Sequence, residues 1–185
     1  MTLIRVVFLC AFALLLSLPP AAAESISDVD KTRVRITDPW IRQLFAAGLA
    51  GSPTFRSLVE RIEESDVVVY LQTDPYGMPG LAGRLSFLSV VRDTRYLVIR
   101  LTPLRSAVQQ LAMMGHELQH AVEVADQPAI VDAESMYREY LRIGYLNGSI
   151  GSGVGVDTKA AMEAGGRISD ELRDAPFVFP PALLP

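Results

Sequence analysis

The chain has 185 residues, half of them hydrophobic, with 17 basic and 21 acidic side chains, a formal net charge of -4 and one cysteine. This length suits one compact domain, and the charge balance excludes a basic surface of the kind that binds nucleic acid. A lone cysteine excludes a scaffold held together by disulfide bonds, so the fold must depend on a hydrophobic core.

The N-terminus has the organisation of a secretory signal peptide. Arg5 precedes an apolar run over Val6–Leu18, and Ala21–Ala23 supplies the small residues that a signal peptidase requires. We expect cleavage after the last of these alanines, which removes Cys10 and leaves a single domain over residues 24–185. The apolar run is too short and wrongly flanked for a typical membrane-spanning helix, and no later segment is long enough. A retained N-terminal anchor is the less favoured alternative. The sequence therefore predicts an exported protein, periplasmic or secreted, that has no membrane span after cleavage.

Two short helices are predicted early in the domain. After an extended lead-in over Glu24–Thr37, Asp38 and Ser52 each precede a proline, which is the usual order of an N-cap and the first helical residue. Apolar residues then recur at helical spacing. The first helix is expected to end at Gly51.

Three strands are predicted next. β-branched residues dominate Asp66–Thr73, and a loop rich in Pro and Gly follows over Asp74–Gly83. Arg84–Val91 and Arg95–Leu101 are two further apolar runs that a short polar turn separates, which favours an antiparallel hairpin. The expected architecture is an α+β fold, with a small antiparallel or mixed sheet packed on helices.

A long buried helix is predicted after the hairpin, with Thr102 as its N-cap and an apolar stripe that continues to Ala125. A second helix over Asp132–Tyr145 is expected to direct three side chains inward, those of Met136, Tyr140 and Ile143.

The last part of the domain contains a Gly-rich segment, Asn147–Val156, that predicts a flexible loop. Asp157 follows as the N-cap of a helix from Thr158 to Ala164. Ile168–Leu172 is expected to add a last helical turn before the Pro-rich end of the chain.

Both histidines of the chain lie in the motif HELQH on the long helix. His116 and His120 are four residues apart, so their rings project from one helical face and can converge on one ion. Glu117 follows the first histidine directly, where a carboxylate can accept a proton from a zinc-bound water. Such a short pattern also arises by chance in ordinary helices, so an unoccupied surface motif is the competing interpretation.

The motif resembles that of the zincin metallopeptidases, in which a helix bearing His-Glu-x-x-His packs under a mixed sheet. The segments HELQHAVEV, MYREYLRIG and DTKAA are also similar to those of small exported bacterial proteins of unassigned activity. The zincin resemblance implies one zinc ion per chain, held by His116 and His120, with Glu117 as the general base.

A catalytic zinc site usually has three protein ligands, and four carboxylates compete for the third place. Asp157 ranks first because it begins the DTKAA segment, which is part of the resemblance to the small exported bacterial proteins. Glu134 ranks second, since in the gluzincin-type zincins a glutamate from the following helix completes the site. Glu123 lies about 10 Å along the helix from the first histidine, which is a long reach for a common ion. It suits a role in orienting His120 or pairing with a basic residue, and a merely solvated side chain is the equal alternative. Asp126 has metzincin spacing but lacks the glycine that those proteins need midway.

The leading functional hypothesis is a secreted zinc-dependent peptidase that hydrolyses peptide bonds through a zinc-activated water. A polypeptide substrate is expected if Arg84–Val91 is an edge strand, because zincins commonly hold an extended peptide against such a strand. The alternative hypothesis is a non-catalytic binding or structural module that zinc stabilises. A tyrosine or arginine that stabilises the oxyanion is also expected, and the candidates are Tyr137, Tyr140, Arg138 and Arg142, none of which is assigned the role.

Overall fold

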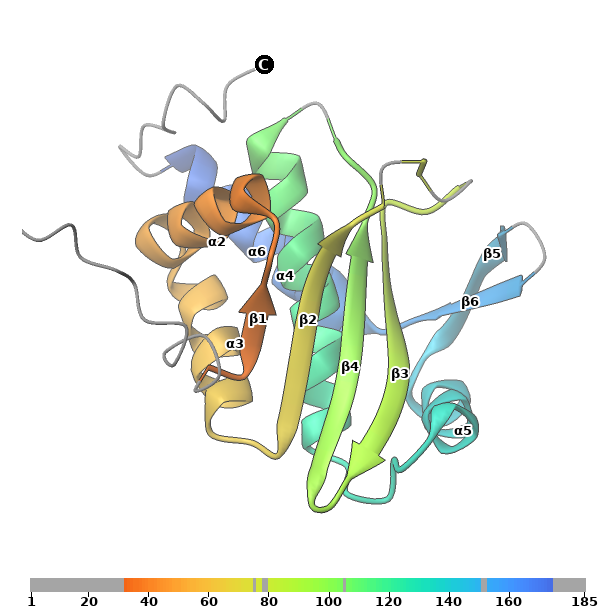
Figure 1. Ribbon diagram of the computed structural model, residues 1–185. Coiled ribbons are helices and arrows are strands. Elements are labelled where there is room, and N and C mark those ends of the chain that lie inside the picture. The colour runs from red at the N-terminus through yellow and green to blue at the C-terminus, as the bar shows by residue number, and fades with distance from the viewer. Residues whose placement is uncertain (1–31, 75, 78–79, 105, 151–152, 175–185) are drawn as a thin grey trace, which may run out of the picture.

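The computed structural model describes residues 32–174, except 75, 78–79, 105 and 151–152. Its described part is an α+β fold in which five helices pack against a four-stranded mixed sheet (Figure 1), so the predicted fold class is confirmed. Among the described helices, none is both long and apolar enough to cross a membrane. The predicted signal peptide lies outside the described residues.

The sheet has the spatial order β1-β2-β4-β3. Its strands are β1 (Val34–Ile36), β2 (Val67–Thr73), β3 (Gly83–Val91) and β4 (Thr94–Leu101). The first three in spatial order run parallel, and β3 pairs antiparallel with β4. The predicted hairpin is therefore confirmed, and its first strand is an edge strand of the sheet.

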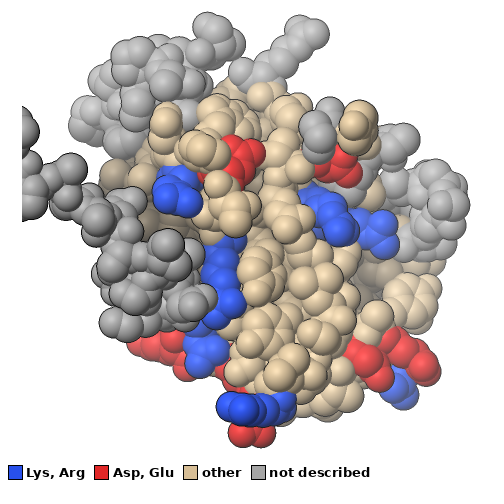
Figure 2. All heavy atoms as spheres, in the orientation of Figure 1, with Lys and Arg blue, Asp and Glu red and all other residues tan. Residues whose placement is uncertain are grey.

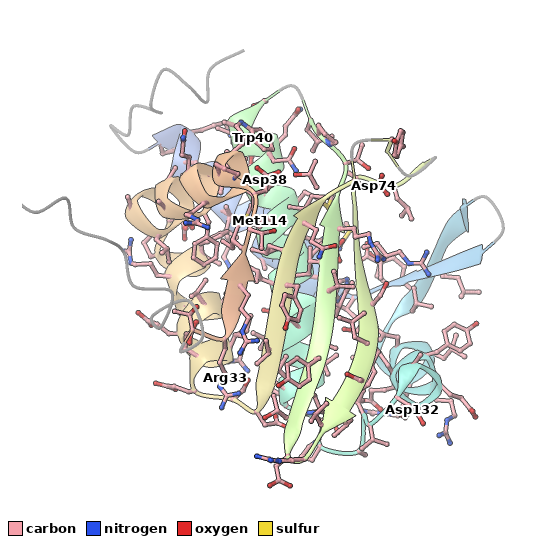
Figure 3. All side chains as sticks on the ribbon, viewed as in Figure 1. Arg33, Asp38, Trp40, Asp74, Met114 and Asp132 are labelled. Carbon is pink, nitrogen blue, oxygen red and sulfur yellow. The ribbon has the colours of Figure 1, made fainter. Side chains whose placement is uncertain are left out.

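Helices α2 (Pro39–Gly51) and α3 (Pro53–Glu63) begin as the sequence predicts. The Asp38 carboxylate accepts a hydrogen bond from the Trp40 N–H at 2.8 Å, near the upper end of β1 in Figure 3. The Ser52 hydroxyl accepts one from the Phe55 N–H at 3.0 Å. Both caps satisfy amide groups that the first helical turn leaves without partners.

The long helix α4 (Ala107–Ala125) is confirmed, but the predicted N-cap is wrong. The Thr102 N–H donates to the Ala82 carbonyl and its hydroxyl donates to the Leu81 carbonyl, each at 2.9 Å, so this residue extends the hairpin instead of starting a helix. Ser106 is the N-cap. Pairing across the sheet thus outweighs a local capping preference.

The segment after α4 contains helix α5 (Ala133–Ile143) and then the hairpin of β5 (Tyr145–Ile150) and β6 (Gly153–Asp157). The prediction of a flexible loop over Asn147–Val156 is wrong, because most of this segment lies in paired strands. Ile143 is also 38% exposed, whereas the sequence predicts that it faces inward.

The last described element is one continuous helix, α6 (Lys159–Asp174), where the sequence predicts a helix and a separate turn. Gly165 of this helix and Gly115 of α4 allow the two helices to pack closely. A Cβ at Gly165 would lie 3.1 Å from the Ala112 carbonyl oxygen, and one at Gly115 would lie 2.0 Å from the Ile168 Cδ1. This close approach of α6 to α4, seen behind the sheet in Figure 1, positions the candidate site.

One hydrophobic cluster joins the sheet to the helical layer, and α4 lies at its centre. Met114, labelled in Figure 3, is completely buried in this cluster. His116 and His120 follow Met114 within the next two turns of the same helix, so they are held by an element that the core immobilises on most sides.

Candidate metal centre

The two histidines of the motif lie next to each other on α4. The ring centroids of His116 and His120 are 4.9 Å apart, with an angle of 83° between the ring planes. Their side chains are 15% and 8% exposed. The spacing of four residues therefore produces the convergence that the sequence predicts.

Asp157 completes a group of three. This residue ends β6 immediately before α6, and its Oδ1 lies 3.3 Å from the Nε2 of His116 and 3.7 Å from the Nε2 of His120. One potential ligand atom from each residue lies within 4.8 Å of the other two. Ligand atoms placed tetrahedrally around an ion, each about 2.1 Å from it, are about 3.4 Å apart. Two imidazole nitrogens and a carboxylate at these distances could hold a metal ion.

Asp157 is not the helix N-cap that the sequence also predicts. The Thr158 hydroxyl takes that role and accepts a hydrogen bond from the Ala161 N–H at 3.1 Å. The Thr158 N–H in turn donates to the Oδ1 of Asp157 at 2.7 Å. The cap is therefore one residue later, and the Asp157 carboxylate is oriented toward the histidines.

Glu123 lies behind the histidine pair. Its Oε2 is 2.8 Å from the Nδ1 of His120, and its Oε1 accepts a hydrogen bond from the Thr158 hydroxyl at 2.6 Å. With the proton of His120 on Nδ1, the Nε2 lone pair faces Asp157 and is suited to a metal. The Tyr140 hydroxyl also donates to the His120 carbonyl at 2.9 Å. Glu123 thus has the geometry of the orienting role that the sequence suggests.

Glu117 lies next to the group in a nearly closed environment, with only 5% of its surface exposed. Burial raises its pKa to about 7; the charge of His120 opposes this shift, whereas the charge of Asp157 adds to it. A Cβ at Gly83 would lie 2.7 Å from the Oε1 of Glu117, so only glycine leaves room for this carboxylate beside β3. A backbone hydrogen bond from Leu85 also reaches it.

The histidines have opposite electrostatic environments. Burial lowers the pKa of His116, and the charge of His120 lowers it further. Burial also disfavours the charged form of His120, but the hydrogen bond to Glu123 and the charge of Glu117 outweigh it and raise the pKa of this ring. The group gathers several carboxylates around two imidazoles, an arrangement that a divalent cation stabilises.

The structure does not bring the other two candidate ligands to this group. Glu134 is at the start of α5 with its side chain 82% exposed, and its nearest charged partner is Arg138 at 3.9 Å. Asp126 forms an ion pair with Arg61 at 2.6 Å beyond the end of α4. Neither carboxylate belongs to the group of His116, His120 and Asp157.

Tyr145 is a site residue that the sequence reasoning missed. It pairs directly with Asp157 in the β5-β6 ladder, so their side chains project from one face of the hairpin. Its surface is 45% exposed, and partial desolvation with the charge of Asp157 raises its pKa. Among the tyrosines considered from sequence, Tyr140 is buried and bonded to a backbone carbonyl, and Tyr137 is 48% exposed on α5. Only the strand pairing reveals Tyr145.

Comparisons of this chain with protein-family models, with curated proteins and with solved structures find no match. We therefore infer the function from the chemistry of the group itself.

Proposed function

We propose that this protein is a zinc-dependent metallopeptidase that hydrolyses peptide bonds. His116, His120 and Asp157 are the proposed ligands, and the observation that supports catalysis is the position of Glu117. A buried carboxylate stands beside a His/His/Asp group, where it can take a proton from a water molecule and return it. A metal that served only to join two elements would not need such a neighbour.

In the proposed mechanism, a zinc ion held by the three ligands would polarise a carbonyl group and acidify a water molecule. Glu117 accepts the proton of the attacking water and then delivers it to the departing amine. Gly83 and the backbone of Leu85 keep this carboxylate in place. Glu123 holds the ring of His120 in the orientation and tautomer that a metal requires.

Tyr145 is the proposed electrophile that stabilises the oxyanion, because it is the phenol paired with Asp157. The loss of one such donor typically lowers kcat by about 100-fold to 1,000-fold. We expect Tyr145→Phe to lower kcat by this factor and to retain the metal, as measured by steady-state kinetics and elemental analysis. The matched control is Tyr137→Phe, and an equal loss in the control would refute the assignment.

A polypeptide substrate is proposed because β3 is an edge strand of the sheet and Glu117 lies beside it. An extended peptide can add to such an edge through backbone hydrogen bonds. Export from the cytoplasm is proposed on the basis of residues 1–23 of the sequence alone.

The first test combines metal content with two variants of the motif. We expect about one zinc ion per chain in the purified protein by elemental analysis, and loss of this zinc in His116→Ala. Glu117→Gln should retain the zinc and lose hydrolysis of a peptide library by at least about 100-fold. Glu134→Gln is the matched control and should retain both properties, because its carboxylate is exposed.

The metal content and the hydrolysis of the wild-type protein in the same assays separate the two functional hypotheses. Bound zinc without hydrolysis by the wild-type protein would favour the zinc-stabilised binding or structural module, in which the ion connects α4 to the start of α6. A folded wild-type protein that binds no metal would refute both.

A further inference from the structure

Two exposed arginines lie side by side on the outer face of the sheet, which is the face away from the helices. Arg84 of the edge strand β3 pairs directly with Arg100 of β4. Neither side chain has an ion pair or hydrogen bond with another described residue. Like charges directly opposite each other destabilise a sheet. An anion bound between them would remove this cost.

The outer face of the sheet has the opposite charge to the chain as a whole. Strands β1 to β4 contain four arginines and no acidic residue, although the net charge of the chain is -4. Of these arginines, Arg95 faces the helices, and the others are Arg35, Arg84 and Arg100. Figure 2 shows basic side chains on both sides of an uncharged central strip, with the acidic ones chiefly around the margin. This face therefore favours an anionic partner.

The backbone pattern of β3 places its free edge next to the catalytic carboxylate. Because the Thr102 N–H bonds to the Ala82 carbonyl, the next residue, Gly83, directs its amide and carbonyl away from β4, and so does Leu85. The backbone hydrogen bond from Leu85 to Glu117 agrees with this alternation. Glu117 therefore lies at the edge where a further strand would pair.

We propose that the peptidase selects substrates with an acidic side chain close to the scissile bond, and that Arg84 and Arg100 recognise this side chain. The proposal rests on the proposed function. A peptide that pairs with β3 alternates its side chains between the two faces of the sheet. Arg84 lies between Gly83 and Leu85, so the outward side chain of the peptide next to it is within about two residues of the bond at Glu117. Arg100, about 4.8 Å farther from the peptide, adds to the positive potential.

The test uses the full mature chain loaded with zinc and pairs of fluorogenic peptides that differ only in Asp against Asn, or Glu against Gln, near the scissile bond. We expect kcat/KM to be about tenfold higher for the acidic member, which is the selectivity of about one charge-assisted contact. In the double variant R84Q/R100Q this ratio should fall toward one. In R84E/R100E it should invert in favour of peptides with Lys at the same position.

The control variant is Arg33→Gln, which removes an arginine at the opposite end of the sheet (Figure 3) and should keep the selectivity. Cleavage without a preference for acidic peptides would overturn the inference and leave the proposed function intact. Equal loss of selectivity in the control would also overturn it, since the effect would then come from the general charge of the sheet.

If no peptide is cleaved, the proposed function fails, and binding decides the inference separately. Fluorescence anisotropy would then compare the labelled acidic and amide peptides on the wild type and on R84Q/R100Q. Tighter binding of the acidic peptide that the double variant abolishes would support the recognition site. Equal binding of the two peptides, or binding to vesicles of anionic phospholipid in place of peptide, would refute it.

Discussion

Helix α4 has a polar cluster near its middle and another at its C-terminus. The two clusters differ in their balance of hydrogen-bond donors and acceptors. At the C-terminus, Arg95 is 4% exposed and donates to both carboxylate oxygens of Asp66, at 2.8 and 2.6 Å. It also donates to carbonyl groups at and just beyond the end of the helix, those of Val124, Ala125, Gln127 and Ile130. Near the middle, His116, His120 and Asp157 bring atoms with lone pairs together.

The difference indicates what each cluster is for. Arg95 supplies five N–H donors to a carboxylate and to the negative end of a helix dipole, so donors and acceptors match within the protein. The histidine cluster has more acceptors than donors, an imbalance that a bound cation would remove. The first cluster therefore fixes the end of α4, and the second is suited to a ligand.

The largest expected effect comes from removing Arg95 from the cluster at the C-terminus of α4. Arg95→Ala removes a buried guanidinium and leaves the carbonyl groups at the end of α4 without their donor, in addition to the ion pair with the half-exposed Asp66. We therefore expect the free energy of unfolding to fall by about 3–5 kcal/mol. Urea denaturation measures this loss. The folded fraction should still bind zinc in the same proportion, and a loss below about 1 kcal/mol would show that the cluster contributes little.

A smaller effect, on zinc affinity, is expected from a change at Glu123, which lies behind the proposed ligands. Glu123→Gln keeps the shape of the side chain but removes the charge that orients His120, so zinc affinity should fall by about 10-fold to 100-fold. Competition with a chelator of known affinity measures the change. The matched control is Glu163→Gln on α6, whose side chain is half exposed, and unchanged affinity in the Glu123 variant would remove its orienting role.

The smallest expected effect is the pH dependence of the stability that the ion pair of Arg95 and Asp66 contributes. The hydrogen bond from Arg95, opposed in part by burial, lowers the pKa of Asp66. A lowered pKa in the folded state gives stability that is present above the unfolded pKa of about 3.9 and is lost as the pH falls through the folded value. Because the Asp66 side chain is 45% exposed, we expect Asp66→Asn to cost only about 1 kcal/mol at neutral pH.

Thermal unfolding of wild type and Asp66→Asn from pH 7 down to pH 2 tests this sign. The difference between the two proteins should shrink as the pH falls below the unfolded pKa. A difference that stays constant across this range would mean that the charge of Asp66 is not its source.

The local sequence determined much of the fold and half of the site. Asp38-Pro39 and Ser52-Pro53 begin helices because their capping chemistry acts within one helical turn. The alternation after Arg84 produces the hairpin, and the spacing of four residues places the rings of His116 and His120 together. Each of these features depends on neighbours within a few residues in the chain.

Only the tertiary structure decided the remaining features, because they join segments far apart in sequence. Thr102 extends the sheet instead of capping a helix, since its backbone finds a partner in Ala82. Asp157 reaches the histidines and Glu134 does not, because α6, which follows Asp157, packs closely on α4 through Gly115 and Gly165. Tyr145 lies opposite Asp157 because β5 pairs with β6, whereas the Gly-rich sequence of these strands predicts a loop. Periodicity identifies the elements of this protein, and contacts between distant backbones select the residues that complete the site.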